Sequence, residues 1–215
     1  MLATLAVGAL FGLSLAAPPG PMNAIIAEES VIRGWIAGFK AGLGAMIADV
    51  IFFLLALGGV VTVVERLPRL RSAMVAVGGV LMLYFAYGAV RGAHESFRAA
   101  TTPDSRGFWK ALALALTNPY QILFWLTVGV GLLSPGRIDV LAYASGALSG
   151  IVIVETGSPT LLVGFFGGIV LWITAFPAAL VAAERRSDAM APVVAHLSAA
   201  VLAGFGIYFL VDALL

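Results

Sequence analysis

Charged residues are sparse along the chain and leave long apolar stretches between them. The stretches without Asp, Glu, Lys or Arg cover residues 1–27, 41–48, 50–64, 72–90, 111–136, 140–154, 156–183 and 189–211. A helix needs about 20 apolar residues to cross the hydrocarbon core of a bilayer. Five stretches reach this length alone, and the two that flank Asp49 form a sixth when they are joined. The pattern therefore predicts a membrane protein with several transmembrane helices.

We expect an all-α fold in a single transmembrane domain, residues 1–215, with about six spans. The spans cover about residues 2–27, 36–61, 72–91, 108–133, 159–182 and 192–214. A polar loop at 92–107 joins the third span to the fourth. Residues 134–158, between the fourth and fifth spans, hold only a short apolar core. We predict a re-entrant or surface segment there, with a tilted seventh helix as the alternative.

Composition supports the membrane assignment and excludes several classes of function. The chain is 61% hydrophobic and 11% charged, with a mean hydropathy of +1.06, whereas a soluble domain has about 25% charged residues. Cysteine is absent, which rules out disulfides and thiolate metal sites. The formal net charge of +1 gives no general attraction to nucleic acid. No cleavable signal peptide is expected, because residues 2–17 lack a basic segment.

Basic residues near the ends of the spans predict the orientation, because they favour the cytoplasmic side. One side receives Arg33, Lys40, Arg91, Arg98, Arg106, Lys110, Arg185 and Arg186, and the other receives Arg66, Arg69, Arg71 and Arg137. The first side is therefore expected in the cytoplasm and both termini outside, in the cell membrane of a prokaryote. The cluster of three arginines on the second side opposes this assignment.

Prolines break the first and fourth predicted spans. Proline inside a helix removes a backbone hydrogen bond, and in hydrocarbon the freed groups must face protein or a water-filled cavity. Pro21 and Pro119 each follow a residue suited to cap a helix, Gly20 and Asn118. Each break is thus predicted to start a half-helix whose positive end attracts carboxylates. A kink that serves only packing is the alternative.

Amide side chains stand beside both breaks. Asn23, Asn118 and Gln121 could bind an ammonium or a carboxylate group there, and they could also cap frayed backbone. With Gly20, Pro21 and Pro119 they make up the predicted substrate-binding residues.

Asp49 is the only acidic residue near the centre of a predicted span. An aspartate at this depth costs roughly 2.5–3.5 kcal/mol on insertion scales, so a function or a partner must offset it. Removal from water favours the neutral form of a carboxyl group, which would suit a residue that loads a proton on one side and releases it on the other. We predict that Asp49 couples transport to an ion; the alternative is a protonated side chain bonded to a neighbouring helix.

Glycines at four-residue spacing predict faces where helices approach closely. They are Gly34, just before the second span, Gly38 and Gly42 inside it, and Gly164 and Gly168 in the fifth span. The recurrence of the glycines and of the proline breaks predicts two three-helix halves, residues 1–91 and 108–215. An odd number of spans in each half makes the halves inverted, an arrangement common in transporters.

One local match points to an enzyme and is set aside. Glu28-Glu29-x-x-x-Arg33 resembles an element of membrane-embedded CAAX-type proteases, which also need two histidine motifs for a metal. His94 and His196 do not stand in such motifs. We therefore expect no enzyme, no metal site and no cofactor.

The ordered motifs resemble the LysE/RhtB family of amino-acid exporters. The resemblance lies in Pro19-Gly20-Pro21-Met22-Asn23-Ala24, Arg33-Gly34, Gly38-x-x-x-Gly42-x-Gly44 and Asp49, and then in Asn118-Pro119 followed by Ile122-Leu123-Phe124-Trp125. It covers most of the chain. It implies six helices and outward transport of amino acids or similar metabolites, driven by the proton motive force.

Some positions depart from the family pattern. Met22 stands where many members have Asn or Asp, and Tyr120 stands where a Lys commonly follows the Asn-Pro pair. The lost lysine leaves the substrate class open, because it could bear on how a carboxylate is held.

The partners expected from the sequence are a small-molecule solute, an amino acid first, a proton or Na⁺ as coupling ion, and the lipid bilayer. Homo-oligomers stay among the alternatives. A metal-cation or other small-solute exporter of related fold, and a non-transporting membrane scaffold, are the competing functions.

Overall fold

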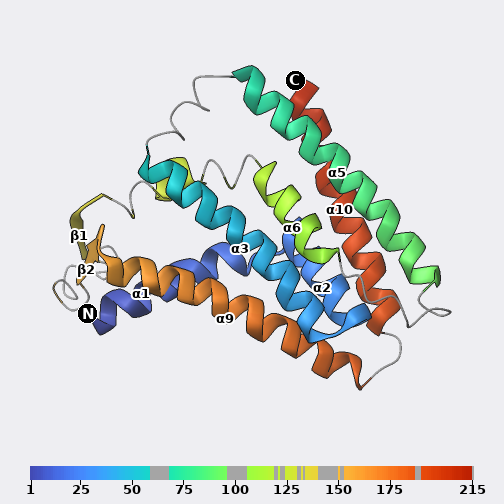
Figure 1. The fold of residues 1–215 in the computed structure, drawn as a ribbon, viewed down its shortest axis with the longest axis horizontal. Helices are drawn as coiled ribbons and strands as arrows, with labels where there is room; N and C mark the ends of the chain where they lie inside the picture. The colour runs from blue at the N-terminus through green and yellow to red at the C-terminus, as the bar shows by residue number, and fades with distance from the viewer. Residues whose placement is uncertain are drawn as a thin grey trace.

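Helices make up most of the part of the chain that the computed structural model describes (Figure 1). The described residues are 1–58, 68–95, 106–118, 121, 124–129, 132, 134–139, 150, 153–186 and 190–214. The helices are α1 (Leu2–Ala16), α2 (Pro21–Arg33), α3 (Trp35–Leu57), α5 (Pro68–Glu95), α6 (Gly107–Leu116), α9 (Pro159–Glu184) and α10 (Met190–Leu214). A π-helical turn, η1 (Trp125–Gly129), and two strands, β1 (Gly136–Asp139) and β2 (Ile153–Thr156), complete these elements.

The first predicted span is broken where the prolines predict. Helix α1 ends at Ala16, and α2 begins at Pro21 after the extended residue Gly20. Proline suits this first helical position, because its missing N–H would have no partner inside the helix. The two helices form an angle of 85°. The break is therefore a sharp change of direction.

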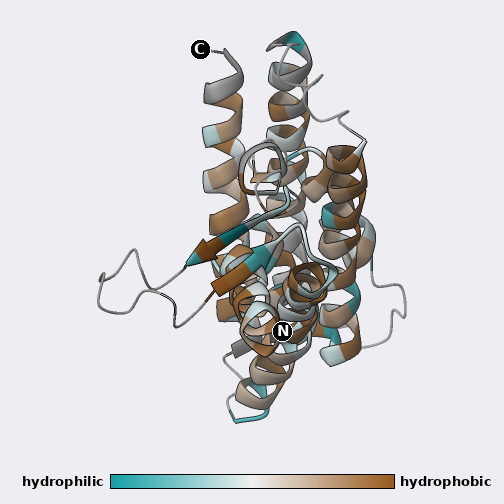
Figure 2. Ribbon diagram, turned by 90° about the vertical axis from the view of Figure 1, so that its left-hand side faces the viewer, coloured by the Kyte–Doolittle hydropathy of each residue, from teal (hydrophilic) through white to brown (hydrophobic). Residues whose placement is uncertain are grey.

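Three described helices are long and apolar enough to cross a membrane. They are α3, α9 and the Pro192–Val211 part of α10, and α1 with α2 makes a fourth candidate if the bent pair is one span. The six-span count stays a prediction. Hydrophobic residues, drawn brown, recur along the helices in Figure 2. Large apolar side chains such as Leu54, Val163 and Leu197 are more than half exposed, as expected where helices face lipid.

The helices pack in three main pairs. Helix α1 lies along α9, α3 packs against α6, and α5 runs beside α10 (Figure 1). Helix α2 then contacts α3, α10, α9 and α6. This short helix therefore joins the three pairs into one body.

Glycines permit the close crossing of α1 and α9. A Cβ added at Gly164 would collide with the Leu5 carbonyl, and one added at Gly168 with the Ala9 carbonyl. Gly8 and Gly12 face the backbone of α9 in the same way. Backbone thus meets backbone along this pair, and any side chain at these positions would push the helices apart.

The glycines of the second predicted span have different surroundings. A Cβ at Gly38 would meet the Ser30 hydroxyl, and one at Gly42 would approach the Ile173 Cβ to 2.5 Å. Gly34 instead connects α2 to α3 with a φ of 88°, and no atom lies within 4 Å of its would-be Cβ. A left-handed backbone favours glycine, so Gly34 is a joint between helices and not a packing position.

The second half of the chain is also interrupted. Helix α6 ends at Leu116, and the Thr117 hydroxyl donates back to the Ala113 carbonyl. The wider π-helical turn η1 follows from Trp125. Pro119, the proposed first residue of the second half-helix, lies outside the described residues.

The 134–158 stretch contains two strands that the sequence analysis did not predict. Strand β1 pairs antiparallel with β2, with Arg137 opposite Glu155, and the two side chains approach to 3.7 Å. The described ends of the stretch are thus extended and not helical, and residues 140–149 between them lie outside the description. The all-α expectation misses this small sheet.

The close crossing of α1 and α9 predicts that a larger residue at its glycines lowers stability. Gly168→Ala should lower the free energy of unfolding by about 1–3 kcal/mol, because the added methyl meets the Ala9 backbone and overpacks the crossing. Gly167→Ala is the control, since no atom lies within 4 Å of a Cβ at that neighbouring position. Thermal unfolding in detergent measures both. Equal losses in the two variants would contradict the close crossing.

Candidate functional site

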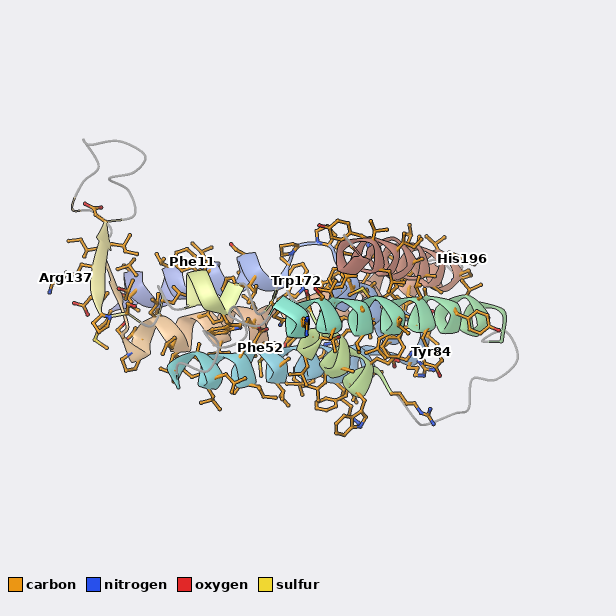
Figure 3. The ribbon with its side chains drawn as sticks, turned by 90° about the horizontal axis from the view of Figure 1, so that it is seen from above. Phe11, Phe52, Tyr84, Arg137, Trp172 and His196 are labelled. Carbon is orange, nitrogen blue, oxygen red and sulfur yellow. The ribbon has the colours of Figure 1, made fainter. Side chains whose placement is uncertain are left out.

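A cavity of about 200 Å³ lies where the α1–α2 break meets the middle of α3 and α9. It is lined by Leu15, Ala16, Pro18, Gly20, Pro21, Met22, Asn23, Ile26, Gly42, Ala45, Met46, Asp49, Asn118, Gln121, Ile169, Trp172 and Ile173. Figure 3 shows one of these residues, Trp172, near the middle of the long axis, far from the sheet end marked by Arg137. The cavity thus lies near the middle of the long axis of the molecule, away from the sheet.

Asn23 holds the α1–α2 break together. Its Nδ2 donates to the Ala16 carbonyl at 2.7 Å and to the Pro18 carbonyl at 2.8 Å. Its Oδ1 accepts a 3.0 Å hydrogen bond from the indole Nε1 of Trp172 on α9. One amide therefore satisfies two carbonyls freed by the break and ties the break to a second helix, as an apolar medium requires.

Asp49 is buried, with 5% of its surface exposed, and it is held by two donors from the second half of the chain. Gln121 Nε2 donates to Asp49 Oδ1 at 2.8 Å, and the indole Nε1 of Trp125 donates to the same oxygen at 3.0 Å. Because both bonds use Oδ1, the other oxygen keeps its capacity to accept a proton or to bind a cation.

Aromatic rings enclose the Trp125 side of this arrangement. Trp125 is fully buried and makes edge contacts with Phe53, Phe124 and Phe165, with ring centroids 5.6–5.7 Å apart. It stacks on Phe166 at 6.3 Å. The rings fix the indole and, through its N–H, the position of the Asp49 carboxyl.

The wall of the cavity combines a polar side with an apolar side. Asp49 supplies a carboxyl group, the side chains of Asn118 and Gln121 supply amides, and the start of α2 supplies backbone N–H groups. Ile169 and Ile173 line it from α9. A carboxylate attracts a cation and a helix N-terminus attracts an anion, so the cavity can hold a small molecule that carries both charges.

The structure brings most of the predicted site residues together. Gly20, Pro21, Asn23, Asn118 and Gln121 all line the cavity, together with the predicted coupling residue Asp49. Pro119 is outside the described residues. The packing glycines of α9 face α1, away from this group.

Two tryptophans were missed by the sequence analysis. Trp125 follows Gln121 by four residues, and Trp172 follows Gly168 by four, so each continues a helical face already singled out. An indole N–H inside an apolar segment also needs an acceptor. These two observations together could have placed both residues beside the polar groups of the breaks.

No metal site is evident in the described part of the chain, where no three His, Asp or Glu side chains gather closely enough to hold an ion. Transporters of small solutes commonly have their binding sites beside a break in a membrane helix, like the break between α1 and α2. The chain belongs to the family of LysE type translocators, whose model matches residues 13–213.

Characterised and uncharacterised relatives match the chain over part of its length. It is 32% identical to the leucine efflux proteins of Salmonella choleraesuis and Salmonella typhimurium over 147 residues, 66% of this chain and 66% of theirs. It is 30% identical over 141 residues to an uncharacterized membrane protein of Pseudomonas aeruginosa, 62% of this chain and 64% of that protein. The matched segments thus span slightly less than two thirds of these relatives. No solved structure matches the chain.

The role of Asn23 in the break is open to test. Asn23→Ala should destabilise the protein by about 1–3 kcal/mol for each carbonyl left without its partner. Ser14→Ala, on the exposed side of α1, should change the unfolding temperature little. An Asn23→Ala variant as stable as the native chain would show that the break does not depend on this amide.

Proposed function

We propose that this protein exports amino acids or similar small metabolites across the cell membrane by alternating access to the cavity. The observation that carries the proposal is that Asp49, the amides of Asn118 and Gln121, and the start of α2 meet in one largely apolar cavity. Membership of a translocator family also supports a transport function.

The two charged groups of an amino acid have complementary partners in the cavity. The ammonium group binds at Asp49, which is already oriented by Gln121 and Trp125. The carboxylate binds at the positive end of α2, where Gly20 provides no side-chain cap for the free N–H groups. Asn118 adds an amide to the wall between them. Paired recognition of this kind selects a zwitterion over a simple cation or anion.

The remaining wall favours an aliphatic side chain. Ile26, Ile169 and Ile173 are nearly fully buried, and they line the cavity with Met22 and Met46. At about 200 Å³ the cavity is smaller than the pockets of about 300–1,000 Å³ that take drug-sized ligands. A solute of modest size with an apolar side chain fits these limits, and two of the relatives named above are leucine efflux proteins.

Asp49 is the proposed coupling residue. It is the acidic group in the wall of the cavity, so an ion bound there and an ammonium group bound there would compete for the same carboxyl. Such competition permits exchange. The solute leaves when the cavity is open to the outside, and a proton bound in its place is carried back when the cavity opens to the inside. Na⁺ is the alternative coupling ion.

The inverted repeat remains part of the proposal. If each half contains three spans, α1 with α2 corresponds to α6, α3 corresponds to α9, and α5 corresponds to α10. The packing of α3 against α6 then has its counterpart in the packing of α9 against α1 and α2. The packing of α5 against α10 is its own counterpart. All three pairings occur. They support a rocking motion of one half against the other around the cavity.

A counterflow screen tests the proposal directly. Purified protein in liposomes is preloaded with one unlabelled amino acid at a time, and uptake of the labelled form is followed with and without a pH gradient. Neutral aliphatic amino acids are expected to exchange fastest. Movement of divalent metals but no amino acid would overturn the substrate class, and absence of any exchange would favour a scaffold.

Asp49→Asn tests the coupling residue. The amide keeps the size of the side chain but cannot carry a negative charge, so export driven by a pH gradient should fall at least about tenfold, which corresponds to about 1.4 kcal/mol. Glu155→Gln, at an exposed position of strand β2, is the matched control and should export normally. If Asp49→Asn inserts at native levels and exports as well as the control, Asp49 is not the coupling residue.

A further inference from the structure

Four charged side chains form a cluster between α2 and α6, beyond the cavity. Arg33 Nη1 lies 3.0 Å from Glu29 Oε1, and Lys110 Nζ lies 3.7 Å from Glu29 Oε1 and 3.9 Å from Glu28 Oε1. The Glu29 side chain is fully buried and that of Glu28 is 6% exposed. Two acidic and two basic groups balance each other, as a buried cluster requires.

The cluster lies between the cavity and the face of the molecule where α2 ends and α6 begins. Ile26 lines the cavity, Glu29 stands about one turn further along α2, and α2 ends one turn later at Arg33. On the other side, Lys110 is in the first turn of α6, and Asn118, which follows the end of this helix, lines the cavity. A path from the cavity to this face along α2 and α6 therefore passes the cluster.

The interior beside the cluster is closed by small residues. A Cβ added at Gly107 would lie 2.6 Å from Glu29 Cγ and 3.2 Å from the Ala41 Cβ. Ala41 and Ala111 are fully buried. Helices α2, α3 and α6 thus pack closely at this level.

We propose that Lys110 with Glu28 and Glu29 is a latch that closes the cavity toward the face where α2 ends and α6 begins. The inference rests on the proposed transport function, because it assigns these residues to one of the two access states. Their role is to position the helices, and they make no contact with the cavity.

Three features distinguish a releasable latch from a permanent brace. The contacts of Lys110 at 3.7 and 3.9 Å are ion pairs longer than a hydrogen bond. The Lys110 side chain is 22% exposed, so solvent reaches it when the pair opens. Helix α2 is flanked by non-helical backbone at residues 17–20 and at Gly34, so a shift of α2 away from α6 does not require α1 or α3 to bend.

The native chain contains no cysteine, so a single introduced thiol can report access to the cavity. Ala45→Cys places this thiol in the cavity wall. A separate Arg106→Cys variant, on the exposed residue before α6, identifies the face from which a membrane-impermeant maleimide reaches the start of α6. Labelling is then measured from each face in oriented vesicles without added solute.

Lys110→Met in the Ala45→Cys background should raise the labelling rate from the α6 face about tenfold, because it leaves two buried carboxylates without their shared partner and favours the open state. Lys40→Met, which removes an exposed lysine from α3, should leave the rate unchanged. Glu28→Gln breaks only the 3.9 Å pair, and it should raise the rate by a smaller factor with the fold intact.

Each result decides the proposal. Fast labelling of Ala45→Cys from the α6 face in the otherwise native chain, or an unchanged rate in folded Glu28→Gln and Lys110→Met, would overturn the latch. If Lys110→Met does not fold, Glu28→Gln alone decides. Failure of the native chain to exchange amino acids in the counterflow screen would overturn the proposed function and leave the labelling result standing, so the two failures are distinguishable.

Discussion

The arrangement of this protein depends on one constraint: backbone groups freed inside an apolar medium must find partners. The break between α1 and α2 frees carbonyl groups at Ala16 and Pro18, and Asn23 binds both. The same side chain is tied to α9 through Trp172. Because the break is satisfied from within, the start of α2 can remain beside a cavity. The polar groups of the cavity wall are therefore a consequence of how the break is stabilised.

Close helix packing sets the second condition for the site. Where α1 crosses α9, glycines allow backbone contact, and this brings the end of α1 against the middle of α9. Gly42 likewise allows α3 to pack closely against Ile173. The walls that carry Asp49 and Trp172 are held at their separation by these contacts. A cavity between helices is thus defined as much by residues without side chains as by the polar groups that line it.

The sequence predicted the parts of the structure that follow from local rules. The positions of the prolines predicted where α2 begins. The presence of one acidic residue in an apolar run marked Asp49 as a candidate site residue. The same reasoning could not foresee that Gln121 and Trp125 would both bond to Asp49, because that contact joins residues more than 70 positions apart. It also misread Gly34, since spacing alone does not distinguish a packing glycine from a joint. Glu28 and Glu29 received no role, because their partner Lys110 is distant in sequence.

The joint at Gly34 has a consequence for the mechanics of the molecule. Helix α2 is 13 residues long, which makes it a rigid rod of about 20 Å with a pivot at each end. A tilt of about 10° displaces one end of such a rod by about 3 Å relative to the other. This movement requires no helix to bend, so it is resisted by backbone torsions at the two ends and by the packing of α2 against its neighbouring helices. Small rotations at Gly34 therefore correspond to translations at the start of α2, which lines the cavity.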